Sequence, residues 1–407
     1  MKKQNPADAA TEKWLGTQKE LSGGRRVFDI TLVIVLSAMI LVGGILIFVL
    51  PSKDFSQEEN RMLTTFPKFS FESLLSGEFT SDIGSFYSDQ FPFRDALVGF
   101  KANLELALLR CENNGVLVGE DGYLIDRLEY SEAEYSNLEN SLAAIDKFLA
   151  YCEENGYPSD LALMPRSIDV MQSKLHPFFD TARADAAWDI VNATSVSYVD
   201  LLPELRARAA KGEYVWYKTD HHYTTLGAYY VYRALGETLG YTPVSLDHFD
   251  MYTASDSFHG TTYSASGTKW ADFDRIDFYR YDGDTEIKLL DSLGNEIESD
   301  GFYVNSYLEK KDKYSAFLGG NSARLSVKHT DGKDRPTLLI VKDSFSHAIV
   351  PFLAIHFDIE LVDMRYYKSS AAKLALELAP DRVLVFYGID TLASSDEATK
   401  LGIIPKG

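Results

Sequence analysis

The chain has 407 residues, a net charge of −20 and a hydrophobic content of 45%, which is ordinary for a globular protein. This length accommodates two domains, or one large α/β domain with additions. Because nucleic acid binds a basic surface, the acidic composition argues against nucleic acid as a partner.

The first predicted element is an apolar stretch, residues 27–50, in which Asp29 is the only charged residue. A helix of about 24 residues is long enough to cross a hydrocarbon core of roughly 30 Å, and too long for the apolar part of a cleaved signal peptide. Basic residues precede the stretch and acidic residues soon follow it. This distribution predicts a signal anchor at the cell membrane, with residues 1–26 cytoplasmic and everything after about residue 51 outside. A buried core helix is the alternative.

The next segment, residues 51–130, is interpreted as a juxtamembrane connector with short helices. It contains the sequences ENR at residues 59–61 and DQFPFR at residues 89–94. Near its end, residues 119–122 read GEDG and separate two apolar runs. This pattern predicts a hairpin.

Helical and strand-like segments alternate over much of the remaining chain, residues 131–407. Helices are expected over residues 138–152, 182–191, 224–239, 345–357 and 371–378, and buried strands over residues 161–164, 196–199, 337–341, 359–362 and 382–386. Alternation of helices with apolar strands is typical of a parallel sheet in a three-layer α/β domain. Residues 245–335 differ, because Tyr, Phe, Gly, Ser and Asp dominate there. They predict a β-rich insertion.

The chain contains only two cysteines, Cys111 and Cys152. No second cysteine lies close enough to either of them to form a metal clip. A disulfide between them is compatible with a location outside the cytoplasm, and two free thiols are the alternative. Nothing else in the sequence indicates a cofactor.

A candidate nucleophile is Ser344, in the sequence VKDSF at residues 341–345. It follows a predicted buried strand and opens a predicted helix. Ligands bind at the carboxyl ends of parallel strands, and the amides at a helix N-terminus can stabilise an oxyanion. Capping of that helix by Ser344 is the simpler alternative.

Candidate partners for this serine occur in TDHHYTT, residues 219–225. A serine nucleophile needs a base, and the base needs an orienting carboxylate. In an extended segment Asp220 and His222 point to the same side, while His221 points to the other. Helix capping by Asp220 is one alternative, and a metal site of Asp220, His221 and His222 is another. No metal is expected, because no further ligand follows at a fixed spacing.

These motifs together resemble the DHHW family, a branch of SGNH-hydrolase-like proteins related to alginate O-acetylation proteins. The naming motif corresponds to Asp220-His221-His222-Tyr223, with Tyr in place of the usual Trp. The nucleophile segment corresponds to Lys342-Asp343-Ser344, with Lys342 where SGNH enzymes usually have Gly. The ENR and DQFPFR segments resemble the N-terminal part of the same family.

The resemblance implies a three-layer, flavodoxin-like SGNH fold over residues 131–407 and assigns roles to single residues. Ser344 corresponds to the nucleophile, His222 to the base and Asp220 to its orienting acid. Asn321 and Gly320, in the sequence LGGN, correspond to the segment that lines the oxyanion hole. Arg365 follows the next predicted strand and is a further candidate for binding a substrate oxygen.

The implied activity is O-acetyl transfer to an extracytoplasmic polysaccharide. Because acetyl-CoA is charged and cytoplasmic, such an enzyme needs a membrane partner that passes acetyl groups outward, and a membrane-bound O-acyltransferase would serve. A polysaccharide acetyl esterase is the first alternative. An inactive, glycan-binding scaffold is the second.

Overall fold

The computed structural model describes residues 6–56, 61–126, 129–179, 182–283 and 286–405. The chain divides into two compact units, residues 1–98 and residues 99–407. Each unit is described below by itself.

The first unit consists of one long helix followed by short elements. Its elements are α1 (Pro6–Val49), β1 (Phe55–Ser56), β2 (Arg61–Met62), α2 (Phe71–Ser76) and α3 (Glu78–Asp89), and α4 (Arg94–Ala107) begins in it. The stretch Arg25–Val49 of α1 has a mean hydropathy of 3.0 and is the helix among the described residues that is long and apolar enough to cross a membrane. Predicted and observed apolar helices therefore coincide.

The second unit is built on a seven-stranded sheet with the order β10-β11-β13-β12-β14-β6-β7. Its strands are β6 (Ser159–Met164), β7 (Val199–Asp200), β10 (Ile287–Leu290), β11 (Arg324–His329), β12 (Thr337–Lys342), β13 (Asp358–Val362) and β14 (Arg382–Gly388). The five strands from β13 to β7 run parallel to their neighbours, whereas β11 pairs antiparallel with both β10 and β13. The α/β class is confirmed, but the sheet is mixed rather than wholly parallel.

Both faces of the central strands are buried. In β12, Leu338 and Ile340 belong to one hydrophobic cluster, and Leu339 and Val341 belong to the other. The first cluster includes α8 (Leu202–Ala210), α9 (Thr225–Leu239) and α11 (Val350–Leu353), and the second includes α5 (Glu132–Glu154), α7 (Ala182–Ala193), α12 (Ala371–Leu378) and α13 (Ile389–Ser394). The uninterrupted apolar character of the strand sequences follows from this two-sided burial.

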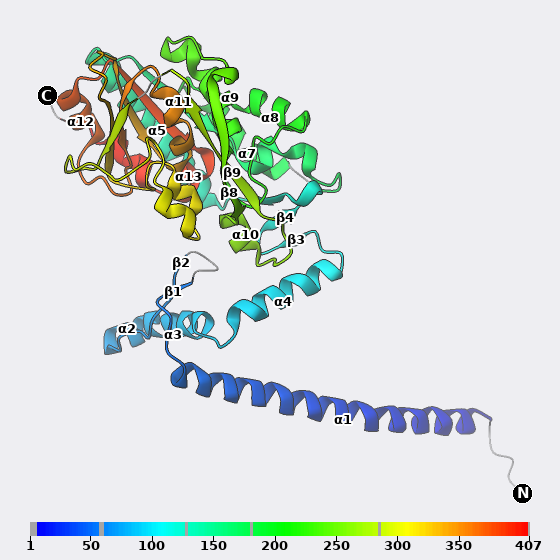
Figure 1. Ribbon diagram of the computed structural model, residues 1–407. Coiled ribbons are helices and arrows are strands. Elements are labelled where there is room, and N and C mark those ends of the chain that lie inside the picture. The colour runs from blue at the N-terminus through cyan, green and yellow to red at the C-terminus, as the bar shows by residue number, and fades with distance from the viewer. Residues whose placement is uncertain (1–5, 57–60, 127–128, 180–181, 284–285, 406–407) are drawn as a thin grey trace, which may run out of the picture. The chain divides into compact units, whose positions relative to one another are not determined.

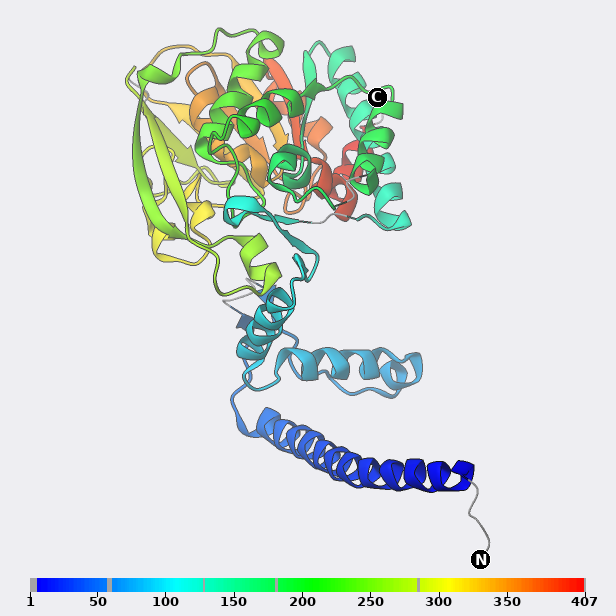
Figure 2. The same ribbon diagram turned by 90° about the vertical axis from the view of Figure 1, so that its right-hand side faces the viewer.

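The segment 245–335 is only partly the separate β-rich insertion that its composition suggests. The strands β8 (Phe249–Phe258) and β9 (Asp274–Tyr281) form their own antiparallel ribbon, visible in yellow-green in Figure 2. Between them lies α10 (Thr261–Ser266). The other two strands, β10 and β11, instead extend the main sheet, because their apolar side chains Leu289 and Val327 join its core.

The predicted hairpin around residues 119–122 is confirmed. It joins β4 (Val116–Val118) to β5 (Leu124–Asp126) through a 3-10 turn, and β3 (Glu112–Asn113) completes this small antiparallel sheet. The predicted strand over residues 196–199 is largely absent, since β7 comprises only Val199 and Asp200 at the sheet edge.

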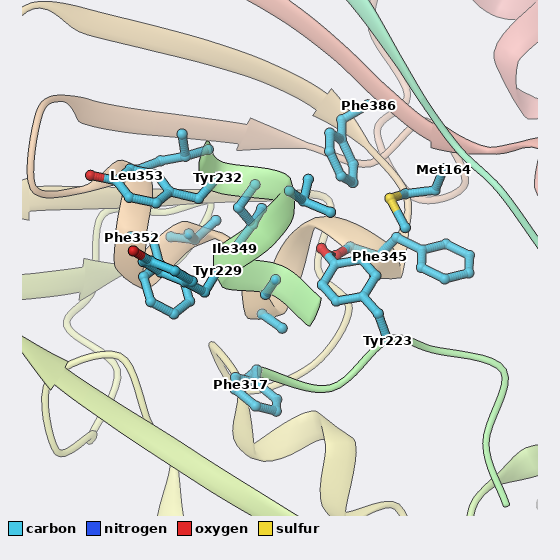
Figure 3. Close-up of a cluster of buried hydrophobic side chains, with 14 of the residues drawn as sticks. Met164, Tyr223, Tyr229, Tyr232, Phe317, Phe345, Ile349, Phe352, Leu353 and Phe386 are labelled. Atoms are coloured by element: carbon cyan, nitrogen blue, oxygen red, sulfur yellow. Dashed lines mark hydrogen bonds between the residues drawn. The ribbon is translucent and has the colours of Figure 1, made fainter. Parts of the chain in front are cut away.

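The segment after β12 corrects another prediction. In place of one helix over residues 345–357, a 3-10 helix covers Ser344–Ala348 and the single turn α11 follows. Pro351 lies in the first turn of α11, where its missing N–H cannot continue a helical ladder from the preceding residues. Figure 3 shows Phe345 next to Tyr223, with Met164 and Phe386 nearby, so the residue after Ser344 is fixed in the core.

Candidate active site

Ser344, His222 and Asp220 form one continuous hydrogen-bonded chain. The Oγ of Ser344 lies 2.8 Å from Nε2 of His222, and Nδ1 of His222 lies 2.6 Å from Oδ1 of Asp220. Ser344 is the first residue of the 3-10 helix, two positions beyond the carboxyl end of β12. With Nδ1–H donating to the carboxylate, Nε2 is left to accept the serine proton, which is the arrangement that a general base requires.

The Asp220 carboxylate is held from the opposite side by α10. Its Oδ2 accepts hydrogen bonds from the Thr261 backbone N–H (2.9 Å) and from the Thr261 hydroxyl (3.2 Å). A Cβ atom at Gly260 would lie 2.2 Å from Oδ2 of Asp220, so only glycine fits there. Both oxygens of Asp220 therefore have fixed partners, which orients His222.

The loop that carries Asp220 and His222 is anchored by a second buried carboxylate, Asp274 in β9. Asp274 accepts the backbone N–H groups of Lys218 (2.8 Å) and Thr219 (2.7 Å). Thr224 caps the following helix α9 by accepting the N–H of Gly227. The two ends of the loop are thus fixed independently of the hydrogen bonds among Asp220, His222 and Ser344.

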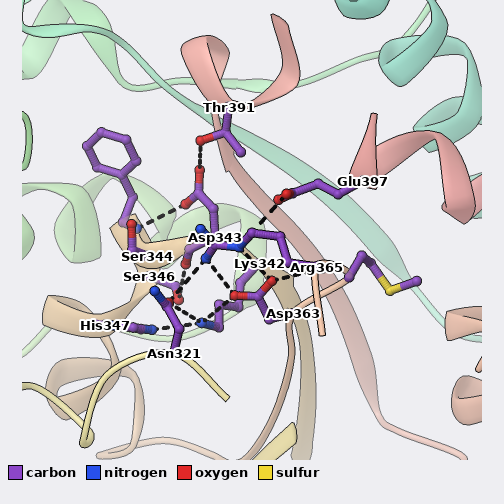
Figure 4. A network of polar contacts seen from close by, with 12 residues as sticks. Asn321, Lys342, Asp343, Ser344, Ser346, His347, Asp363, Arg365, Thr391 and Glu397 are labelled. Carbon is purple, nitrogen blue, oxygen red and sulfur yellow. Dashed lines mark hydrogen bonds and ion pairs between the residues drawn. The ribbon is translucent and has the colours of Figure 1, made fainter. Parts of the chain in front are cut away.

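Asp343 fixes the turn that presents Ser344. Its Oδ1 accepts the Phe345 N–H (3.0 Å), and its Oδ2 accepts the Gly388 N–H (2.7 Å) and the Thr391 hydroxyl (2.7 Å), as Figure 4 shows for Thr391. Gly388 is the last residue of β14. One buried carboxylate therefore ties the turn that carries Ser344 to the end of the neighbouring strand.

Aromatic rings enclose the imidazole of His222. The Tyr314 ring stacks on it with centroids 3.8 Å apart and planes inclined by 9°, and the Phe345 ring meets it edge-on at 5.0 Å. Tyr223, at the position where the resembled family has Trp, donates its hydroxyl hydrogen to the Phe345 carbonyl. The tyrosine at this position therefore hydrogen-bonds to the turn that carries Ser344.

Burial governs the charge states of the pair. Burial lowers the pKa of His222 to about 4, and the charge of His221 adds to this effect against the attraction of Asp220. Burial acts to raise the pKa of Asp220, but the two histidines and the bond from Thr261 outweigh it and hold that pKa below its usual range. At neutral pH the imidazole is thus neutral and the carboxylate ionised, as a base and its orienting acid should be.

A second polar group lies at the ends of β12 and β13, and Figure 4 shows it. Asp363, fully buried, accepts from Lys342 Nζ (3.2 Å) and from Arg365 Nε (2.9 Å) and Nη2 (2.6 Å). Both cations also reach the side-chain oxygen of Asn321, Lys342 at 3.5 Å and Arg365 at 3.1 Å. Lys342 contacts Nε2 of His347 as well, at 2.7 Å. The lysine that departs from the SGNH pattern is thus the centre of an ionic network.

The predicted oxyanion and substrate residues fall into this second group, apart from the first. Among the described residues, no hydrogen bond or ion pair joins Asn321, Gly320 or Arg365 to Ser344 or His222. The Gly320 N–H donates to the Phe317 carbonyl at 3.2 Å and is thus engaged in its turn. Within the same described part of the chain, the Ser344 N–H has no hydrogen-bond partner.

The alternative metal site consists of Asp220, His221 and His222, whose ligand atoms lie within 4.8 Å of one another. Both ring nitrogens of His222 are already engaged, by Asp220 and by Ser344. An ion bound there would have to replace the hydrogen-bonded chain. The two cysteines are free thiols, and burial raises the pKa of Cys152 to about 12.

Several residues of the site were not anticipated from the sequence. Asp343 could have been noticed, because it directly precedes Ser344 and an Asp at that position can cap a turn. Thr261, Asp274 and Tyr314 carry no local signal, since each lies at least 41 residues along the chain from the residue that it contacts.

Comparison with known proteins finds two matching protein families and several similar proteins. Residues 196–362 match the DHHW protein family, and residues 116–257 match a family described as SGNH hydrolase-like domain, acetyltransferase AlgX. The chain is 25% identical over 178 residues to a probable alginate O-acetylase AlgJ of Pseudomonas fluorescens, covering 41% of this chain and 44% of that protein. The AlgJ of Pseudomonas syringae is 26% identical over 191 residues, which cover 44% and 47% of the two chains.

The chain therefore spans less than half the length of the curated relatives that it matches. Among solved structures, a DHHW family protein from Eubacterium siraeum is similar with a TM-score of 0.58 and 21% identity, covering 72% of this chain and 98% of that one. Bacillus cereus PatB1 with a sulfonyl adduct gives 0.56 and 18%, with coverage of 69% and 98%. These two likenesses are of fold. The family matches confirm the predicted resemblance: parts of the chain match the DHHW family and the SGNH hydrolase-like domain family, and the chain is similar to probable alginate O-acetylases.

Proposed function

We propose that this protein is an extracytoplasmic O-acetyltransferase that acetylates a cell-surface or exported polysaccharide through Ser344, His222 and Asp220. The observation that carries the proposal is the continuous chain from Asp220 through His222 to the Ser344 hydroxyl. The relatedness to proteins named alginate O-acetylases supports acetyl as the group and polysaccharide as the acceptor class.

The proposed reaction has two steps. The Ser344 oxygen attacks the carbonyl carbon of an acetyl donor while Nε2 of His222 takes its proton, and the donor group leaves with that proton. A glycan hydroxyl then attacks the acetyl-serine, passes its proton to His222, and the Ser344 oxygen leaves and regains a proton. Asp220 stabilises the imidazolium that forms in each step.

Charge that develops on the carbonyl oxygen needs hydrogen-bond donors. The free N–H of Ser344 is one candidate, and the amide of Asn321 is the second. Lys342 and Arg365 both bind the side-chain oxygen of Asn321, which leaves its NH₂ group available to donate. Each such donor contributes roughly 3 kcal/mol of transition-state stabilisation.

The membrane-length helix at Arg25–Val49 supports an anchor with the second unit outside the cytoplasm. Basic residues before this helix favour that orientation. On that side of the membrane acetyl-CoA is absent, so a membrane-bound O-acyltransferase is the proposed source of the acetyl group. No cofactor takes part in the proposed chemistry.

The test is acetyl-ester turnover by the full-length protein in detergent, with 4-nitrophenyl acetate as donor and a soluble glycan as acceptor. Ser344→Ala should abolish turnover and the acetyl adduct that mass spectrometry detects on the wild type. Ser346→Ala is the matched control, because it removes a hydroxyl that bonds only the Asp343 carbonyl in the same turn. Equal turnover by Ser344→Ala and wild type would end the proposal.

The polysaccharide acetyl esterase remains the second candidate, since the same three side chains can hydrolyse an acetyl-serine with water as acceptor. Glycan acetylation in cells that lack the gene separates the two activities. A transferase loses acetyl groups from the glycan, whereas an esterase gains them. A glycan-binding scaffold would bind the polysaccharide without any acyl-serine under either condition.

A further inference from the structure

The segment directly after the membrane-length helix, in the first unit, is held together by specific hydrogen bonds. Gln90 accepts the Lys53 N–H (3.0 Å) and donates to the carbonyls of Lys53 (2.8 Å) and Thr64 (3.1 Å). Asp89 accepts the Thr64 N–H at 2.8 Å. The first two residues of the DQFPFR sequence therefore tie the end of α3 to the chain that leaves α1.

The same module packs against the last turns of α1. The ring of Phe91 lies so close to Gly43 that a Cβ there would be 2.9 Å from it. The Phe48 ring, also on α1, contacts Phe66 at 6.4 Å and Tyr87 at 6.3 Å between centroids. Gly43 and Ile47 are buried by these contacts, whereas most of the preceding apolar helix is exposed.

The position of these contacts along α1 sets their depth. A helix rises about 1.5 Å per residue, so a hydrocarbon core of roughly 30 Å that begins after Arg26 ends near residue 46. Gly43 then lies a few ångströms inside the outer boundary, and Phe48 lies at that boundary. Phe91, Phe66 and Tyr87, which contact them, must be at the outer interface as well.

The module also exposes large apolar side chains. Phe71 and Leu75, in a short helix with no buried residue, are 76% and 87% exposed, and Phe93 is 76% exposed. Phe93 has a φ of 59°, a left-handed backbone that is strained for a bulky residue. This strained backbone directs the Phe93 ring away from the module. We infer that the ring contacts an apolar environment outside the protein.

We propose that residues 62–98 form an interfacial module whose exposed apolar side chains, Phe71, Leu75 and Phe93 among them, insert between lipids of the outer leaflet. The inference rests on the anchor proposed above. Acidic side chains, among them Glu72, Glu78 and Asp82, accompany the few basic ones, so apolar burial and not attraction to anionic lipid drives insertion. Insertion is therefore expected in zwitterionic phosphatidylcholine and at high salt.

The test uses the full chain in phosphatidylcholine vesicles, with Cys111 and Cys152 replaced by Ser. Single cysteines at positions 71, 75 and 93 carry an environment-sensitive fluorophore, and lipids brominated on their acyl chains act as quenchers. Leu293→Cys is the matched control, because Leu293 is 84% exposed in the second unit. Quenching at positions 71, 75 and 93 and none at 293 is expected. Reporters as water-exposed as position 293 would overturn the proposal, and so would shielding without quenching, which indicates a protein occupant.

A pair of neighbouring glycines sharpens the test. Gly43→Leu should push Phe91 away and reduce quenching at position 93, whereas Gly44→Leu should not, because nothing lies within 4 Å of a Cβ there. Equal effects of both substitutions would contradict the proposed seating on α1. A reporter at position 35, inside α1, must be quenched in every variant. If it is not quenched, the result contradicts the proposed membrane anchor and not the proposed interfacial module.

Discussion

Two groups of polar side chains flank the end of β12, and their hydrogen-bonding arrangements differ. On one side, Asp220, His222 and Ser344 form a linear chain in which His222 alone joins the carboxylate to the hydroxyl. On the other side, Asp363 is shared by two cations, which also share Asn321. Loss of any one of these three side chains interrupts this chain of hydrogen bonds. In the second group Asp363 has two cations, and Arg365 has a further carboxylate, Glu397, at 3.8 Å, but Lys342 depends on Asp363 alone as its paired carboxylate.

The largest expected effect is on the chain of single partners. Asp220→Asn should lower the turnover of an acetyl ester by a factor on the order of 10⁴. An asparagine has one accepting oxygen, so its NH₂ group must oppose the N–H donors of either His222 or Thr261. Turnover of 4-nitrophenyl acetate measures the loss. Asp277→Asn, a buried carboxylate in β9 outside this chain, should retain activity, and comparable loss in both variants would refute the distinction.

The next effect is on the shared carboxylate. Asp363→Asn leaves the buried Lys342 without an anion and the half-buried Arg365 with only the more distant Glu397, at 3.8 Å, and should lower the free energy of unfolding by about 3–5 kcal/mol. Denaturant unfolding followed by circular dichroism measures this change. Adding Lys342→Met to Asp363→Asn should recover part of the loss, because it removes a stranded charge. A further loss in the double variant would show that the lysine is stabilised by something other than Asp363.

A smaller effect is expected from the aromatic rings that contact His222. Tyr314→Leu removes the ring stacked on His222 and should lower turnover between roughly tenfold and 10²-fold by loosening the base. Burial lowers the pKa of His222 to about 4, so wild-type activity should persist from neutral pH down to that region. In the leucine variant water reaches the imidazole, which raises the pKa of His222. The loss of activity at acidic pH should then begin at a higher pH than in the wild type. The pH profile measures both, and Tyr314→Phe, which keeps the ring, should leave the pH of that loss unchanged.

The smallest effect tests the redundancy. Lys342→Met leaves Asp363 paired with Arg365, so the free energy of unfolding should fall by only about 1.5 kcal/mol and turnover by less than tenfold. Unfolding and ester-turnover measurements on the purified variant provide the two values. A loss as large as that of Asp220→Asn would mean that Lys342 acts directly in the reaction.

The sequence predicted the strands and the residues of the hydrogen-bonded chain better than it predicted their surroundings. Strand β12 was recognisable because its two-sided burial leaves an uninterrupted apolar run. Asp220 and His222 could be paired because residues two apart share a side in extended backbone. The placement of Asn321 beside Lys342, however, depends on β11 and β13 pairing antiparallel, which no local pattern indicates.

The failed predictions have the same origin. The helix expected after Ser344 ignored Pro351, and the insertion expected over residues 245–335 ignored that an antiparallel strand can extend a parallel sheet. Composition reported the local preference correctly in each case. Which partner each segment would meet was a property of the whole fold.

The contact between Gly260 and Asp220 also constrains how this site can change over time. Because the carboxylate occupies the volume that any side chain at position 260 would fill, the two positions are mutually exclusive for bulk. Random replacement at 260 alone should return only glycine among active clones. If Asp220 is replaced by a smaller residue, position 260 can accept a side chain. An alanine or serine at position 260 would therefore mark a relative that has lost the proposed activity.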